Sequence, residues 1–459
     1  MATLIYSDIA TLRQKLASGD ITPLELTQAY LRRIEEVNPR NPVFISQCVE
    51  QAQQQAEQTE LTHPLSGIPF SCKDLYHAQG LRTTGGSRVL EDFVSDESAH
   101  AVELLEQQGA ILLGKNNLHE FAYGATGVNA HFGTVTNPYD SGRLAGGSSS
   151  GSAAAVALGM SAFALGTDTG GSVRAPAALC GVVGLKPTLG RISLRGIVPY
   201  CWTLDHAGTF TRTIRDAAEL MDILANYDPL DPSCVNTPHQ PCVPMLDTPV
   251  QGKKIGVPDS FFFEHCDPEI LAATHQAIDY LKQQGAEIVP VQMPSMEHTR
   301  TASLTVQLPE ALSYHSDFLQ QRRELYSDEF RSGFAAGQFI LAEHYVRAKR
   351  LIEGYRQQLQ QIFRTVDLLI TPGCPTVAPN IDATQVETAV LSEPAGNAIT
   401  RYTSFFNMTG NPAVTLPSGL HSTGLPMSIQ LVSDLFDEAT LLNVAYQLER
   451  KMGQLPPPR

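Results

Sequence analysis

The sequence predicts an α/β protein built around a mostly parallel or mixed sheet. From residue 65 onward, helix patterns and strand patterns alternate along the chain, which is typical of this fold class. The chain has 459 residues, of which 42% are hydrophobic and 17% charged, so it can bury a large core. Because no linker, internal repeat or low-complexity tail is visible, we predict one domain over residues 1–459.

The first 40 residues are predicted to be helical. The segment from Thr22 to Glu25 has the pattern of a capping box with proline at the first helical position, and Leu31 and Ile34 follow on one face. The alternating segments that follow are a strand and loop in 65–75, a helix and strand in 99–115, a helix in 214–225, a strand in 253–259, a helix and strand in 268–291, a strand in 366–372, and a strand and helix in 427–452.

Three further stretches interrupt or extend this alternation. Residues 151–166, rich in alanine and other small apolar residues, are predicted to form a buried helix that runs into a buried strand. Residues 228–250 are rich in proline and aspartate and indicate a long irregular connection. Residues 296–362 are mainly helical and are predicted to form a helical elaboration, where substrate-specific surface often lies.

Charge and cysteine content narrow the classes of function. The net charge of −15 leaves no excess of Lys and Arg to neutralise phosphates, so no direct nucleic-acid partner is expected. None of the eight cysteines forms a CxxC pair or a zinc-ligand spacing, which predicts reduced, mostly buried thiols in a cytoplasmic protein. The N-terminal residues do not resemble a signal peptide, and no apolar run is long enough for a membrane span.

Three motifs resemble known signatures, but each of them lacks a required part. Residues 109–116, "GAILLGKN", approach a P-loop, yet the segment is itself a strand and ends in asparagine instead of a hydroxyl residue. Residues 147–151, "GSSSG", match the nucleophile elbow of α/β-hydrolases around Ser149, with only His421 in order as a base, but no strand precedes them. His119 in "HEF" has no second histidine, so no metal and no cofactor are expected.

A fourth arrangement combines three uncommon elements in a fixed order. Lys73 lies at the end of a predicted strand, Ser148 lies in a glycine- and serine-rich turn that opens a helix, and Ser172 follows in "DTGGSVRAP". Taken singly, these elements fit a surface lysine, a flexible linker and a tight turn. However, a linker does not run directly into "AAAVALG", and the three elements together favour a catalytic site.

These residues identify the chain as resembling the amidase signature family, whose hydrolases use a Ser–cis-Ser–Lys triad. The resemblance implies that Ser172 is the nucleophile, Ser148 the bridging serine and Lys73 the base. It also implies a large mixed, mostly parallel sheet covered by helices on both faces, with a catalytic core at about 65–225. The segments that carry it are "LSGIPFSCKD", "GKNNLHEFAYG", "NPYDSGRLAGGSSSGSAAAVALG", "LGTDTGGSVRAPAALCGVVGLKPTLGRIS" and "TPGCPTVAP".

A lysine needs a lowered pKa to act as a base at neutral pH, and burial lowers the pKa of an amine by disfavouring its charge. The neutral Lys73 amine would take a proton from Ser148 while Ser148 takes one from Ser172, which attacks an amide carbonyl. Asp168 and Arg174 are predicted to hold the loop around Ser172, and Ser149 to support it. The expected oxyanion hole consists of the backbone N–H groups of Thr169, Gly170, Gly171 and Ser172.

The substrate pocket is predicted from the loop around residue 123 and from a segment near residue 401. Tyr123 and Trp202 are candidate aromatic walls, although ordinary core packing explains them equally well. Arg401 is a candidate ligand for an anionic substrate group, with a structural ion pair as the alternative. The remaining candidate substrate-binding residues are Gly124 and Gly147.

Subfamily features favour an amidohydrolase that cleaves a small or medium carboxamide or ureido C–N bond. "EFAYG", "NPYDSGRLAGGSS" and "DPLDP" are similar to carboxybiuret and biuret hydrolases and to general amidases, and "RGIVPYCWTLD" is similar to allophanate hydrolases. The glutaminase subunit of the tRNA-dependent amidotransferase is the first alternative, but "PEALSYHSDFLQQR" stands in place of its "YDG-x-RYG" element. A catalytically silent scaffold is the second alternative. The family resemblance implies a homodimer and leaves a small accessory subunit open.

Overall fold

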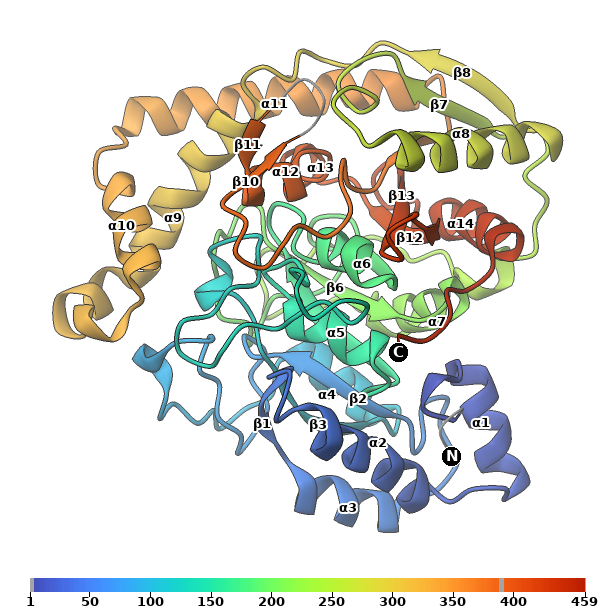
Figure 1. Cartoon of the computed structure of the whole chain (residues 1–459), viewed down its shortest axis with the longest axis vertical. Helices are drawn as coiled ribbons and strands as arrows, with labels where there is room; N and C mark the ends of the chain where they lie inside the picture. The colour runs from blue at the N-terminus through green and yellow to red at the C-terminus, as the bar shows by residue number, and fades with distance from the viewer. Residues whose placement is uncertain (1–3, 388–391, 459) are drawn as a thin grey trace.

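An 11-stranded sheet runs through the molecule and forms its framework (Figure 1). The computed structural model describes residues 4–387 and 392–458. The strand order in the sheet is β1-β3-β2-β4-β6-β5-β12-β13-β9-β7-β8, and β10 pairs with β11 apart from it. The strands are β1 (Phe44–Gln47), β2 (Pro69–Lys73), β3 (Ile111–Asn116), β4 (Phe163–Asp168), β5 (Val183–Lys186), β6 (His206–Thr211), β7 (Lys254–Pro258), β8 (Glu287–Val291), β9 (Leu368–Pro372), β10 (Gln385–Glu387), β11 (Ser392–Pro394), β12 (Ala413–Leu420) and β13 (Pro426–Ser433).

The predicted α/β class with a large mixed sheet is confirmed, and parallel pairs form two groups within the sheet. Strand β2 lies parallel to both β3 and β4, and β7 lies parallel to both β8 and β9. The strands between these groups, from β4 through β6, β5, β12 and β13 to β9, pair antiparallel. The parallel share is therefore smaller than predicted, because tight connections such as the β12–β13 hairpin replace helical crossovers in the middle of the sheet.

Helices cover the sheet on both faces (Figure 1). Helices α5 and α6 pack together and contact β4 and β5, while α7, α8 and α14 form a second group against β6, β13 and β9. The helices are α1 (Ile9–Ser18), α2 (Pro23–Val37), α3 (Val49–Gln58), α4 (His100–Gln107), α5 (Ser150–Ala157), α6 (Arg174–Cys180), α7 (Ile214–Leu224), α8 (Pro268–Gln283), α9 (Thr299–Gln321), α10 (Asp328–Gly337), α11 (Ala342–Phe363), α12 (Ala395–Thr400), α13 (Phe405–Thr409) and α14 (Glu438–Met452).

Local sequence signals explain where several of these elements begin. Thr22 caps α2 and forms the predicted capping box with Glu25. Residues 228–250 are irregular apart from a short 3-10 helix, Val243–Met245, as their proline content predicts. The stretch 296–362 holds α9, α10 and α11, which project together at one side of the molecule (Figure 1).

The parallel arrangement of β2 and β4 brings chemistry-bearing residues to one edge of the sheet. Lys73 is the last residue of β2 and Asp168 is the last residue of β4. Because these adjacent strands run in the same direction, their carboxyl ends lie side by side. Helix α5 packs against both strands and places the turn before it, which contains Ser148, over the same edge.

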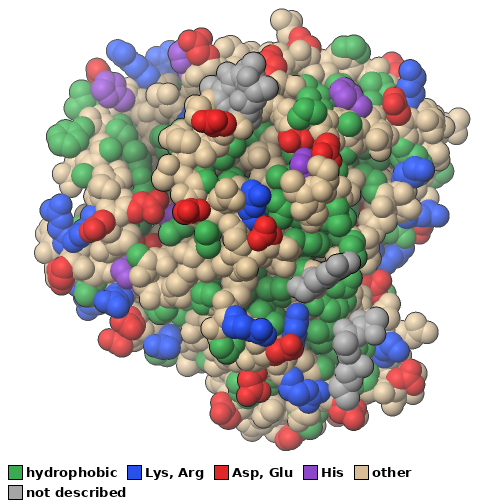
Figure 2. Space-filling view, viewed as in Figure 1, with side chains coloured by type: hydrophobic (Ala, Val, Ile, Leu, Met, Phe, Trp, Pro, Cys, Tyr) green, Lys and Arg blue, Asp and Glu red, His purple; other side chains and the backbone are tan. Residues whose placement is uncertain are grey.

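Charged side chains lie on the surface of the protein, and most of its cysteines lie in the interior. Acidic and basic side chains are interspersed on the face shown in Figure 2. The eight cysteines are all free, and seven of them are buried. Among the helices of residues 4–387 and 392–458, none combines the length and the apolar character that a membrane span requires.

Candidate active site

Lys73 lies at the centre of the site as a fully buried lysine. Its Nζ atom is 2.6 Å from Ser148 Oγ and 2.8 Å from Thr167 Oγ1. Burial lowers the pKa of Lys73 to about 7, although the nearby carboxylates of Asp205 and Asp168 act in the opposite direction. A large fraction of Lys73 is therefore neutral at physiological pH, which is the state in which it can accept a proton.

In the serine-rich turn before α5, Ser148 and Ser149 point to different partners. Ser148 faces Lys73, and the Gly147–Ser148 peptide bond is cis. Ser149 is fully buried, and its Oγ atom hydrogen-bonds the backbone carbonyl of Thr167 at 3.2 Å. The α/β-hydrolase alternative is therefore wrong, because the Ser149 hydroxyl faces the backbone of β4 and His421 forms its contacts with Asp267 and Glu269 elsewhere.

Ser172 follows two glycines in the loop between β4 and α6, and it retains 7% of its surface exposed. Gly171 has a φ of +131°, and a Cβ atom there would lie 2.0 Å from Thr403 Oγ1, so only glycine fits. The N–H group of Gly171 donates to Asp168 Oδ1 at 2.8 Å. This N–H group is therefore engaged and does not serve as the oxyanion donor that the sequence predicted.

The other three predicted donors are free to bind an oxyanion. Across residues 4–387 and 392–458, the N–H groups of Thr169, Gly170 and Ser172 make no hydrogen bond. A Cβ atom placed on Gly170 would meet nothing closer than 3.9 Å, so this residue borders open space. The loop thus presents unpartnered donors beside the nucleophile candidate Ser172, which is the geometry that stabilises a tetrahedral oxyanion.

Asp168 and Arg174 form a buried ion pair under this loop. Arg174 Nη2 lies 2.9 Å from Asp168 Oδ1, and both side chains are fully buried. Asn407 donates to the same carboxylate oxygen at 2.8 Å, and Arg174 also donates to Asn407 Oδ1 and Gln430 Oε1. Burial alone would raise the pKa of Asp168, but the Arg174 charge and hydrogen bonds outweigh it and hold the pKa well below its ordinary value.

Replacing Arg174 with methionine is expected to destabilise the protein by about 3–5 kcal/mol, because it leaves the Asp168 carboxylate buried without a counter-charge. Urea denaturation at pH 7 followed by circular dichroism measures this loss. The matched control is Arg331→Met, which removes an exposed pair with Asp328 on α10 and is expected to cost less than about 1 kcal/mol. Equal losses in the two variants would contradict the proposed importance of the buried pair.

Asp205 is a buried carboxylate beside the site that the sequence analysis did not single out. Thr169 Oγ1 donates to Asp205 Oδ1 at 2.5 Å, and the N–H groups of Tyr200 and Cys201 donate to its other oxygen. Burial raises the pKa of Asp205 to about 6, and these hydrogen bonds and Lys73 partly offset the rise. No local motif marks Asp205, since its role depends on the return of the chain to the end of β4.

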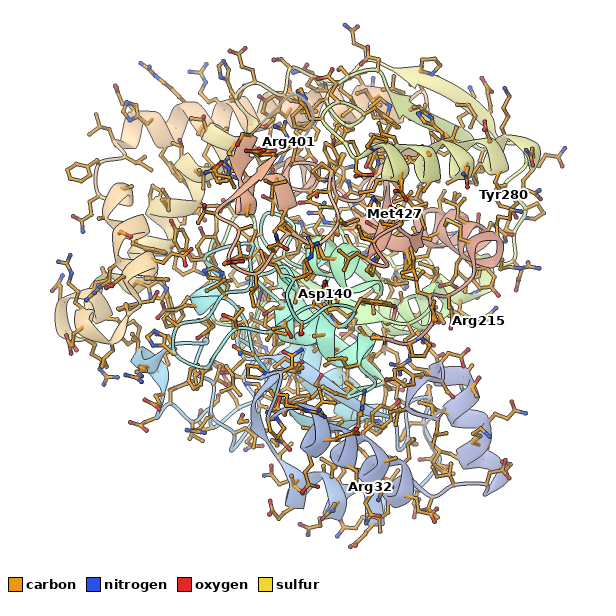
Figure 3. All side chains as sticks on the ribbon, in the orientation of Figure 1. Arg32, Asp140, Arg215, Tyr280, Arg401 and Met427 are labelled. Carbon is orange, nitrogen blue, oxygen red and sulfur yellow. The ribbon has the colours of Figure 1, made fainter. Side chains whose placement is uncertain are left out.

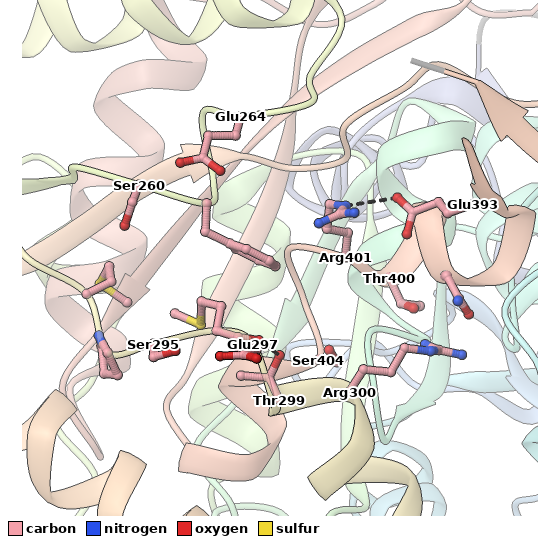
Figure 4. Close-up of a pocket in the computed structure, with 15 residues that line it drawn as sticks. Ser260, Glu264, Ser295, Glu297, Thr299, Arg300, Glu393, Thr400, Arg401 and Ser404 are labelled. Atoms are coloured by element: carbon pink, nitrogen blue, oxygen red, sulfur yellow. Dashed lines mark hydrogen bonds and ion pairs between the residues drawn. The ribbon is translucent and has the colours of Figure 1, made fainter. Parts of the chain in front are cut away.

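An open cleft of about 490 Å³ lies beside the end of α12 (Figure 4), and its lining includes none of Lys73, Ser148 and Ser172. Thr400 and Ser404 connect this cleft with the glycine loop, because a Cβ atom placed on Gly171 would lie 3.4 Å from Thr400 and one placed on Gly170 would lie 4.0 Å from Ser404. Arg401, the predicted anion ligand, also lines it and lies beside β10 and β11 (Figure 3). Its Nε atom pairs with Glu393 Oε1 at 2.9 Å, so the structure shows the ion-pair alternative.

The other predicted pocket residues lie outside this cleft, Tyr123 in an aromatic cluster and Trp202 at a small cavity. Tyr123 packs against Tyr200 and against Phe334 of α10, with ring centroids 6.2 and 5.1 Å apart. Trp202 is 49% exposed and borders a small cavity together with Thr167 and Asp205. Gly124 and Gly147 have packing reasons to be glycine, because a Cβ atom would lie 2.3 Å from the His119 ring and 2.7 Å from the Gly127 nitrogen, respectively.

The P-loop and metal motifs have structural explanations in the described residues. Residues Ile111–Asn116 form strand β3, and Lys115 pairs with buried Asp74 at 3.0 Å, so the P-loop interpretation is wrong. One group in the described part of the chain has the spacing to hold a metal ion, namely Asp222, His239 and Cys242. It lies at the end of α7 and in the irregular connection, and the expectation of no catalytic metal stays a prediction.

Comparison with known proteins agrees with the fold. Residues 25–442 match the model of the Amidase family, and the chain belongs to this family. It is an amide-cleaving hydrolase by that membership.

The chain is similar to the A subunit of glutamyl-tRNA(Gln) amidotransferase from Geobacter sp. (strain M21), with 35% identity over 96% of each chain. Among solved structures it is similar to a chain described as part of a vestigial complex that reveals the origins of an s-triazine catabolic enzyme, with a TM-score of 0.94, 32% identity and coverage of 99% and 100%. It is also similar to 6-aminohexanoate cyclic dimer hydrolase in complex with substrate, with a TM-score of 0.90, 27% identity and coverage of 99% of each chain.

Proposed function

We propose that the protein hydrolyses a small or medium carboxamide or ureido C–N bond through an acyl-enzyme on Ser172. The observation that carries the proposal is the 2.6 Å contact between Ser148 and a buried lysine whose pKa is lowered to about 7. The family membership and the adjoining cleft of about 490 Å³, a size typical of small-molecule sites, support it. The whole chain, residues 1–459, acts as one amidase domain with its catalytic core at about 65–225.

The proposed reaction begins with neutral Lys73. Its amine takes the proton of the Ser148 hydroxyl while Ser148 takes the proton of Ser172, and Ser172 Oγ bonds to the carbonyl carbon. The carbonyl electron pair moves onto oxygen, where the N–H groups of Thr169, Gly170 and Ser172 stabilise the charge. Collapse of this intermediate breaks the C–N bond, and the relay returns the proton to the leaving amine. Water then attacks the ester, loses a proton to the relay and frees Ser172.

Covalent labelling tests this assignment without a known substrate. Treatment with a fluorophosphonate followed by peptide mapping is expected to yield one adduct, on Ser172, and to give a far slower reaction in Lys73→Ala. The Ser149→Ala variant is expected to label at the wild-type rate, because the hydroxyl that it removes hydrogen-bonds the β4 backbone and not Ser148 or Lys73. An adduct on a different serine, or unchanged labelling in Lys73→Ala, would refute the triad.

The pH profile of kcat/KM is expected to rise with pH through an acidic limb near pH 7. Protonated Lys73 cannot act as a base, so the rate falls about tenfold for each pH unit below the pKa of about 7. Asp205→Asn removes a negative charge that favours protonated Lys73, so the limb is expected to move to lower pH. Initial rates from pH 5 to 9 measure the acidic limb of the wild-type protein and that of Asp205→Asn. An unchanged limb in Asp205→Asn would contradict the coupling between Asp205 and Lys73.

A second candidate function is the glutaminase subunit of a tRNA-dependent amidotransferase. The curated relatives favour it over a stand-alone enzyme, because amidotransferase A subunits match nearly the whole chain at 34–36% identity. Ammonia release from L-glutamine and from a panel of simple amides by the purified chain distinguishes the two functions. Turnover of simple amides alone supports the stand-alone hydrolase, whereas glutaminase activity that appears only with amidotransferase partner subunits supports the second candidate.

Partners and location follow from the same proposal. An accessory subunit or a second copy of the chain is supported by relatives that are named as subunits and by a structural neighbour described as part of a complex. The small-molecule amide is the substrate, and the acidic net charge of −15 supports the absence of a direct nucleic-acid contact. The eight free cysteines support a cytoplasmic location.

A further inference from the structure

The cleft beside the glycine loop contains a cation that its surroundings do not neutralise. Arg300, near the start of α9, lines the cleft, and its side chain is exposed there. Within residues 4–387 and 392–458, its guanidinium forms no hydrogen bond and no ion pair. The carboxylate whose charge acts on Arg300, that of Glu393, is already paired with Arg401 at 2.9 Å.

The position of Arg300 connects it with the site. Its charge acts on Tyr123 and Tyr200, so it lies near both rings. The N–H group of Tyr200 donates to Asp205, which in turn accepts a hydrogen bond from Thr169 of the proposed oxyanion loop. Arg300 therefore lies near residues that contact the proposed oxyanion loop, and it lines the same cleft as Thr400 and Ser404.

The charges in the cleft are arranged on two sides. Figure 4 shows the Arg300 side chain extending toward the side of Thr400 and Glu393, whereas Glu264 and Glu297 lie on the other side in this view. Since Arg401 neutralises Glu393, the Arg300 side carries a net positive charge. The planar fork of a guanidinium matches the two oxygens of a carboxylate, and such a charge-assisted pair is stronger than a neutral hydrogen bond.

We propose that Arg300 binds a carboxylate group of the substrate, so that the preferred substrates are amides that carry a carboxylate on their acyl part. This inference rests on the proposed function, because the carboxylate is bound while Ser172 attacks the amide of the same molecule. Arg300 is thus a specificity-determining residue. Arg401 has an indirect role, because its ion pair with Glu393 keeps that carboxylate from neutralising Arg300. The proposal names the chemical class of the substrate, a monoamide of a dicarboxylic acid or a ureido acid.

Matched substrates test the proposal. Monoamides of succinic and glutaric acid are compared with the corresponding neutral diamides, which have nearly the same shape. The wild-type protein is expected to prefer the anionic monoamide by about tenfold or more in kcat/KM, mainly through KM. Arg300→Gln is expected to abolish this preference, and Arg300→Lys to retain part of it because the charge remains. Arg347→Gln, an exposed arginine on α11, is the matched control and is expected to keep the wild-type preference.

Each outcome separates this inference from the proposed function. Equal rates on monoamides and diamides in the wild type, or an equal loss on both substrates in Arg300→Gln, would overturn the role of Arg300 and leave the hydrolase intact. A protein that cleaves neither substrate class and gives no covalent adduct on Ser172 would instead overturn the proposed function itself.

Discussion

Replacing Ser172 with alanine is expected to lower kcat for amide hydrolysis on the order of 10⁴-fold or more, because no acyl-enzyme can form without the hydroxyl. The remaining rate would come from substrate binding beside the oxyanion donors Thr169 and Gly170, which the substitution leaves in place. Steady-state ammonia release measures the loss, with any amide that the wild-type protein cleaves. The fluorophosphonate adduct is expected to disappear in the same variant.

The control for this experiment is Ser332→Ala, which changes an exposed serine on α10 and is expected to keep the wild-type rate. Ser172 is nearly buried, so the thermal unfolding midpoint of Ser172→Ala should be compared with that of the wild type. A folded Ser172→Ala protein that retains more than a tenth of the wild-type kcat would remove Ser172 as the nucleophile.

Replacing Lys73 with methionine is expected to lower kcat by about 10²- to 10⁴-fold, the usual contribution of a general base. Methionine has a similar length and no charge, so it fills the buried site without leaving a cavity. The substitution removes the buried amine beside Ser148 whose pKa is lowered to about 7. The residual activity is therefore expected to lose its acidic limb near pH 7.

Loss of the limb is the readout that separates a base from a packing residue. A structural effect of Lys73→Met would scale the rate at every pH and leave the shape of the profile unchanged. Lys282→Met, an exposed lysine on α8, is the matched control and is expected to preserve both the rate and the limb. A normal limb in Lys73→Met would assign the titration to another group and refute the proposed base.

The comparisons bear on the choice between a stand-alone hydrolase and a glutaminase subunit more than on the proposed reaction, because both candidates cleave an amide bond. The sequence favours a stand-alone hydrolase because "PEALSYHSDFLQQR" replaces a glutaminase element. The curated relatives are nevertheless amidotransferase A subunits over nearly their whole length. The replaced element, residues 309–322, lies almost entirely in α9, whereas the cleft is lined by the first two residues of this helix, Thr299 and Arg300.

The sequence by itself determined many of the helices and strands, although not β1, β5, β6 or β12, and it determined the order of the proposed catalytic residues. Alternating patterns predicted the strands and helices, and the capping box at Thr22 predicted the start of α2, because these depend on local chain chemistry. Lys73, Ser148 and Ser172 were found because each lies in a distinctive stretch. The motifs around them also distinguished this site from the P-loop and nucleophile-elbow patterns.

Only the tertiary structure decided which groups meet. Asp205 approaches Thr169 and Lys73 because β6 returns antiparallel to β4, and no pattern around Asp205 shows that pairing. The pairing of Arg174 with Asn407 and Gln430, more than 200 residues away, likewise depends on side chains brought together by folding. That Arg300 has no ion-pair partner among the described residues is also visible only in the structure. The sequence gives the number of charged residues, but the distances between them in the folded chain decide which of them pair.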